Sequence, residues 1–66
     1  MGFKVRQKVD FQYTDIDGDI LDVYLYHGGI SPVVSMAIGG TRLHVELEDI
    51  PELCILLKRV AASNGN

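Results

Sequence analysis

Three aspartates alternate with other residues between positions 15 and 19, where the chain reads DIDGD. This spacing matches the first ligands of an EF-hand calcium loop, whose carboxylates are the hard oxygen donors that Ca²⁺ prefers. The rest of that loop does not follow, since Ile20 stands where it needs glycine and Tyr26 where it needs glutamate. Asp17-Gly18 is typical of a tight hairpin turn, because both positions tolerate positive φ. We therefore expect a polar turn here and no metal site.

One cysteine and two histidines are the residues that nucleophilic catalysis could use. His27 falls in a connection between strands, and His44 falls on the polar side of a strand. Cys54 falls at the edge of an apolar helical stripe, where cysteine usually acts as a small buried hydrophobe. A sheet domain of 66 residues also leaves little room for a closed pocket. The sequence therefore predicts no enzyme, no catalytic residue and no cofactor.

Basic and aromatic side chains recur in a pattern that single-stranded nucleic acid could use, since bases stack on rings and phosphates meet cations. Tyr13 has the opposite strand parity to the basic residues, so it does not join this face without a bulge. A formal net charge of −3 favours an ordinary solvated sheet face over nucleic-acid binding. The candidate nucleic-acid face consists of Lys4, Arg6, Lys8, Tyr24 and Tyr26.

Acidic residues gather at two places in the chain and suggest a different partner. A small acidic protein can occupy a basic groove on a nucleic-acid enzyme, because its carboxylates stand in for phosphates. Short proteins of phages or mobile elements that inhibit host enzymes have this size and sign of charge. The candidate acidic surface consists of Asp15, Asp17, Asp19, Asp22, Glu46 and Glu48.

The stretch from 41 to 62 organises the chain, because a strand pattern changes there into a helix pattern. Apolar and polar residues alternate over 42–47, which predicts a strand with one buried face. Apolar residues then recur at helical spacing over 50–62. Asp49 is the expected N-cap, Glu52 completes a capping box, and Pro51 suits the first turn. Residues 63–66 are expected to form a frayed tail.

The residues before this stretch supply strands for the helix to cover. Alternation predicts strands at about 3–13, 20–26 and 33–38, and short turns between them force antiparallel neighbours. We therefore expect an α+β fold of one domain, 1–66: a four-stranded antiparallel β-meander with one C-terminal α-helix packed on one face. This order resembles the architecture of the single-stranded-DNA-binding transcriptional coactivators called positive cofactor four. The resemblance covers the topology and the strand-to-helix pattern of 43–60, and it implies a dimer supported by the helix.

Length and composition favour self-association. A domain of 66 residues buries a small fraction of its surface and usually needs disulfides, a metal or oligomerisation. One cysteine allows no internal disulfide, and no Cys/His cluster suits zinc, so a homodimer is the expected support. The helix carries apolar residues beyond the stripe that one sheet requires. The expected interface on its outer side consists of Cys54, Ile55, Lys58 and Arg59.

The sequence also bounds location and function. No apolar run reaches the length of about 18 residues that a membrane span requires, and MGFKVRQKV carries no apolar signal-peptide region. A lone cysteine suits a reducing compartment, so we expect a cytoplasmic protein that binds no membrane. The sequence favours a small, homodimeric, non-catalytic protein-interaction module with an unidentified protein partner. The acidic inhibitor and the single-stranded nucleic-acid binder are the alternatives.

Overall fold

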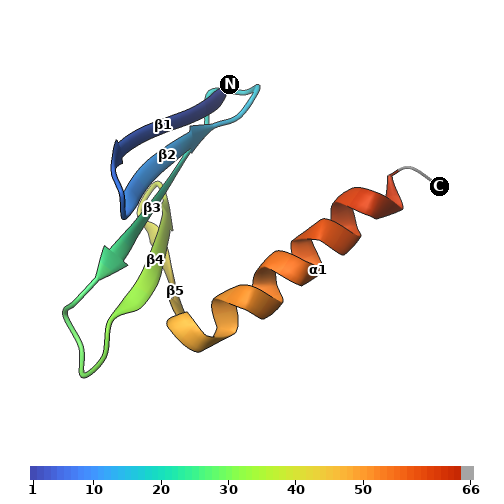
Figure 1. Ribbon diagram of the computed structural model, residues 1–66. Helices are drawn as coiled ribbons and strands as arrows, with labels where there is room; N and C mark the ends of the chain where they lie inside the picture. The colour runs from blue at the N-terminus through green and yellow to red at the C-terminus, as the bar shows by residue number, and fades with distance from the viewer. Residues whose placement is uncertain (65–66) are drawn as a thin grey trace.

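The computed structural model describes residues 1–64 and shows a five-stranded antiparallel sheet followed by one C-terminal helix (Figure 1). Every strand pairs with its neighbours in sequence, so the sheet is a meander. The α+β class and the final helix are confirmed, whereas the strand count was one too low. The strands are β1 (Gly2–Gln7), β2 (Asp10–Thr14), β3 (Ile20–Tyr26), β4 (Val33–Ile38) and β5 (Thr41–Glu46).

The difference in strand count arises at the start of the chain. The predicted single strand 3–13 is a hairpin, in which β1 and β2 are joined by Lys8 and Val9. The register of the hairpin shifts between Val5 and Gln7, at the point where Gln7 interrupts the apolar alternation. This irregularity increases the local twist of a strand and helps to turn the chain back.

The hairpin keeps the predicted apolar side chains on one face despite the extra turn. Paired residues of an antiparallel ladder point to the same side of the sheet. Phe3 pairs with Tyr13, and Val5 pairs with Phe11, so the aromatic residues gather on one face. The basic residue Lys4 pairs with Gln12, and both side chains lie on the face opposite the aromatic residues.

The remaining strands and turns follow the expected pattern. The bounds of β3 and β4 are those predicted, and β5 both begins and ends one residue earlier than expected. Gly18 has φ +86° and Gly39 has φ +60°, so both tight turns use the left-handed backbone that glycine tolerates.

The C-terminal helix begins through a short 3₁₀ turn (Leu47–Asp49) and continues as α1 (Ile50–Ser63). Asp49 holds the N-cap position but makes no side-chain cap hydrogen bond, so the predicted capping role of its carboxylate is wrong. The reason is its backbone: Asp49 already has helical φ and ψ, whereas a capping side chain normally sits on extended backbone. Pro51 lies in the first turn as predicted. Of the predicted tail 63–66, Ser63 ends α1, and Gly65 and Asn66 lie outside the described residues.

The helix does not cover the sheet of its own chain. In Figure 1, α1 runs away from the end of β5 at an angle to the sheet. Within residues 1–64, Val23 is the sole buried hydrophobic residue. The predicted packing of the helix on a sheet face is therefore absent inside one copy of the chain.

Candidate protein-binding groove

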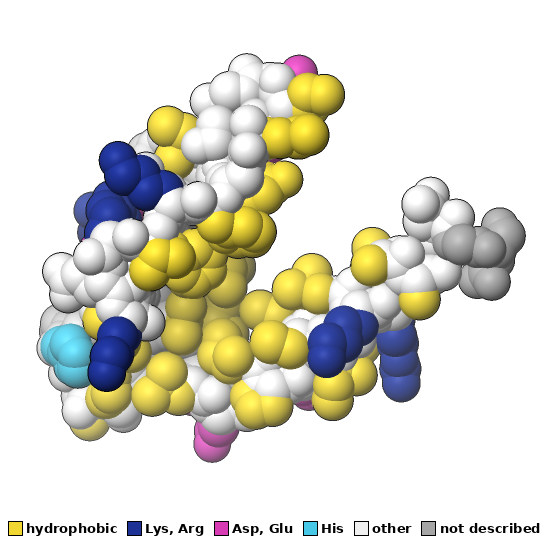
Figure 2. Space-filling view, turned by 45° about the horizontal axis from the view of Figure 1, so that its top comes forward, with side chains coloured by type: hydrophobic (Ala, Val, Ile, Leu, Met, Phe, Trp, Pro, Cys, Tyr) yellow, Lys and Arg dark blue, Asp and Glu magenta, His cyan; other side chains and the backbone are white. Residues whose placement is uncertain are grey.

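A large apolar groove lies between the sheet and α1. Its floor is one face of the sheet, to which all five strands contribute, and its wall is the end of the 3₁₀ turn with about the first two turns of α1. The groove has a volume of about 860 Å³, and Figure 2 shows hydrophobic side chains along both of its sides. The floor consists of Phe3, Phe11, Tyr13, Leu21, Val23, Met36, Leu43 and Val45, and the wall consists of Asp49, Glu52, Leu53, Leu56 and Leu57.

Hydrophobic side chains of this apolar groove are exposed to an unusual degree. Phe3 is 71% exposed, Leu43 is 60% exposed and Leu57 is 58% exposed. Scattered exposed hydrophobics are normal, but a contiguous surface of them marks a docking site. The groove therefore has the composition of a core that one copy of the chain leaves unfilled.

The surface area of the whole chain shows how much packing is missing. The accessible surface is 5499 Å², whereas a compact protein of this mass exposes about 4,200 Å². The radius of gyration is 13.3 Å, against about 11 Å for a compact domain of this length. The chain thus exposes about 1,300 Å² more than a globular monomer of its size.

The predicted interface residues lie beside the groove and do not line it. Ile55 and Cys54 are exposed, and neither is among the groove-lining side chains of the described chain. At 100° per residue, Lys58 falls on the side of α1 opposite Leu53, whereas Arg59 falls close to the edge formed by Glu52. Sequence analysis missed the groove because it assigned the stripe of Leu53, Leu56 and Leu57 to the chain's own sheet.

The opposite side of the sheet, the outer face, carries the polar residues of the strands. Arg6 donates hydrogen bonds to Asp10 and, at 3.0 Å, to Asp22, and Gln12 donates one to Asp22 at 2.9 Å. The hydrogen bond to Asp10, with the negative charges of both carboxylates, raises the pKa of the Arg6 guanidinium above its ordinary value. The central cation of the candidate nucleic-acid face is thus held by two carboxylates.

The two tyrosines of that candidate face, Tyr24 and Tyr26, lie on the same side of the sheet, whereas Tyr13 lies on the other side. Tyr26 stacks on His44 at the outer face, with 5.1 Å between ring centroids and 24° between ring planes. Tyr24 pairs with Asp10 in the ladder, so an acid stands beside it. Tyr13 lines the groove on the other face, as its parity predicted.

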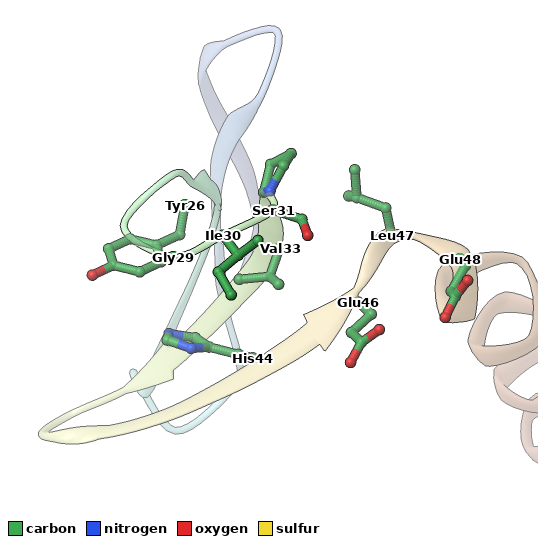
Figure 3. Close-up of a pocket in the computed structure, with 10 residues that line it drawn as sticks. Tyr26, Gly29, Ile30, Ser31, Val33, His44, Glu46, Leu47 and Glu48 are labelled. Carbon is green, nitrogen blue, oxygen red and sulfur yellow. The ribbon is translucent and has the colours of Figure 1, made fainter.

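A second, smaller hollow borders the outer face where the β3–β4 connection approaches β5. Figure 3 shows His44 and Glu46 of β5 with Tyr26 and the loop residue Ile30 around this space. Its volume is about 650 Å³, and both carboxylates and apolar side chains line it. His27 precedes this loop, and Cys54 lies on α1, so the three residues considered for catalysis come from three separate elements.

The predicted acidic surface is split between the two ends of the sheet. The Asp15, Asp17 and Asp19 carboxylates lie within 4.8 Å of one another in the β2–β3 turn. Asp15 Oδ1 accepts hydrogen bonds at 2.9 Å from the backbone N–H groups of Asp17 and Asp19. The carboxylate of Asp15 therefore has a structural role in the turn, which accounts for an acidic residue at this position. Glu46 pairs with the far end of β4, remote from that turn. Asp22 is engaged by Arg6 and Gln12.

Comparisons with known proteins leave the groove as the main guide to function. No family model, no curated protein and no solved structure matches this chain. Within residues 1–64, no helix combines the length and the apolar character that crossing a bilayer would demand.

Proposed function

We propose that this protein is a small, non-catalytic, cytoplasmic protein-interaction module that works as a homodimer. The observation that carries the proposal is the apolar groove, whose floor and wall are both hydrophobic and both exposed. An apolar surface of this extent is costly in water, so its natural role is to be covered by another protein surface.

The size of the uncovered surface supports a dimer. Each copy exposes about 1,300 Å² more than a compact monomer would, so two copies could remove about 2,600 Å² from water together. Obligate homodimer interfaces cover about 2,000 to 5,000 Å² and resemble a domain core cut in half. A chain of 66 residues with one free cysteine has few other means of stabilisation.

Protein binding is better supported than nucleic-acid binding. Arg6 is engaged by the carboxylates of Asp10 and Asp22, Asp10 also stands beside Tyr24, and the net charge is −3. A single-stranded nucleic-acid surface needs cations that are available to phosphates. Fluorescence anisotropy with a labelled oligonucleotide at low salt should therefore stay flat, and salt-sensitive binding would favour the alternative function.

Protein binding is also better supported than inhibition by an acidic surface. The carboxylates of the β2–β3 turn and Glu46 lie at opposite ends of the sheet, so they form no continuous phosphate-like row. Asp22 faces Arg6 and Gln12 instead of solvent alone. A pulldown that recovered a basic nucleic-acid enzyme through these carboxylates would reverse this preference.

Sedimentation of the purified protein across concentration tests the proposal. The parent chain of 7.3 kDa should sediment with twice that mass, and its melting temperature should rise with concentration because folding and association are coupled. Leu56→Asp places a charge in the groove and should shift the mass to that of a monomer. Ile30→Asp, in an exposed loop outside the groove, is the matched control and should leave the dimer intact. A parent chain that sediments as a monomer at every concentration would refute the homodimer.

A further inference from the structure

We propose that the groove of each copy holds α1 of a second copy, with the two helices antiparallel about a two-fold axis. This inference rests on the homodimer proposed above and specifies how the dimer is built. Among residues 1–64, two surfaces are left uncovered: the sheet face that forms the groove floor, and the stripe of Leu53, Leu56 and Leu57 on α1. A single arrangement covers both when the stripe of one copy lies on the floor of the other.

The dimensions of the helix suit the groove. α1 has 14 residues and is therefore about 21 Å long, with a diameter of about 10 Å including side chains. Five strands spaced about 4.8 Å apart give a floor whose width is comparable to the length of α1. Figure 2 shows the hollow open between the sheet and α1, so a helix can enter without moving either. A two-fold arrangement uses the same surface twice and closes the assembly at two copies.

The charges of α1 favour the antiparallel direction. Glu52 and Arg59 are seven residues apart, so they lie within about 20° of each other on one edge of the apolar stripe. In an antiparallel pair, each edge of one helix meets the same edge of the other in reverse order. Glu52 of one copy then lies opposite Arg59 of its partner, and the symmetry forms this pair twice. A parallel pair would place each edge against the opposite edge of the partner helix, so Glu52 and Arg59 would not meet across the interface.

Reciprocal charge changes test this pairing. Glu52→Arg leaves two arginines on the edge, and Arg59→Glu leaves two glutamates, so each variant alone should dimerise about tenfold more weakly than the parent. An equimolar mixture of the two variants restores every pair between unlike chains. Native mass spectrometry separates the species by mass, and the mixed dimer should dominate over both homodimers.

Two further variants separate pairing from loss of folding. A single chain with both Glu52→Arg and Arg59→Glu regains both pairs and should dimerise like the parent. The exchanged charges do not improve the interaction with the helix dipole, so any recovery comes from the pairs between copies. Lys58→Glu makes the same change of charge next to Arg59 but on another side of α1, and it should leave the dimer unchanged.

The possible outcomes divide the two proposals. A dominant mixed dimer together with recovery in the doubly changed chain supports the antiparallel helix pair. A random distribution of mixed and unmixed dimers, or no recovery in the doubly changed chain, would overturn this pairing and leave the homodimer standing. A parent chain that remains monomeric in the same spectra would refute the homodimer itself.

Discussion

The ring of Phe3 packs against the ring of Tyr13 across the β1–β2 hairpin, with 4.8 Å between the centroids and 55° between the planes. Phe11 adds a second ring contact at 5.8 Å. The Phe3 ring is thus held by two aromatic neighbours of its own sheet, while most of its surface remains exposed in the groove. Tilted aromatic pairs of this kind are favourable in themselves, so these contacts hold the rings of the groove floor in place within one copy of the chain.

Leu43 of β5 tests whether the groove is covered in solution. Leu43→Asp at a site 60% exposed should cost little in an isolated chain, within about 0.5 kcal/mol. If another surface covers the groove, the same change buries a charge and should lower the free energy of unfolding by about 2–4 kcal/mol. Thermal or urea unfolding measures the difference. Val9→Asp, at a turn residue 52% exposed and outside the groove, is the control. Equal small losses in both variants would mean that the groove stays open.

The elements with strong periodicity could be read from the sequence. The change from period two to helical spacing near Asp49 located α1, and the bounds of β3 and β4 followed from alternation between turn residues. The β1–β2 turn was missed because Lys8-Val9 carries none of the glycine, asparagine or aspartate signals of a tight turn. The face assignment survived this error, because cross-strand pairing returned Phe11 and Tyr13 to the side of Phe3.

The groove could not be read from the sequence, although its residues could. Periodicity shows that Leu53, Leu56 and Leu57 share an apolar side, but it contains no information on which surface they pack against. Packing onto the chain's own sheet and packing onto another copy require the same pattern. The direction in which α1 leaves β5 decides between them, and that direction depends on the 3₁₀ turn at Leu47–Asp49.

Asp15 should matter for stability through the backbone of its turn. Its carboxylate accepts two backbone hydrogen bonds, so Asp15→Ala should lower the free energy of unfolding by about 1–2 kcal/mol. Asp17→Ala removes the same charge from the same turn but leaves those hydrogen bonds in place, and it should change stability by less than about 0.5 kcal/mol. Urea denaturation of both variants gives the comparison. Equal losses would show that charge, and not hydrogen bonding, governs this turn.

Gly39 and Gly40 offer a test of backbone conformation with matched surroundings. Gly39 has φ +60°, whereas Gly40 has no left-handed φ, and an added Cβ would meet nothing within 4 Å at either position. Gly39→Ala should therefore lower the free energy of unfolding by about 1–2 kcal/mol through backbone strain alone. Gly40→Ala should be neutral or slightly stabilising, since it restricts the unfolded chain. A neutral Gly39→Ala variant in thermal unfolding would show that the β4–β5 turn adopts another conformation in solution.

Ser35 on the outer face of β4 is fully buried between Tyr24 and His44 in the ladder, and its Oγ has no hydrogen-bond partner in the described chain. Burial of an unpaired hydroxyl costs free energy, so Ser35→Ala should raise the free energy of unfolding by about 1 kcal/mol. The exposed Ser31→Ala serves as the control and should stay within about 0.5 kcal/mol of the parent. Urea unfolding of the three proteins decides the matter. A marked loss of stability in Ser35→Ala would mean that the hydroxyl finds a partner in solution, which would make it a structural hydrogen-bonding group of the outer face.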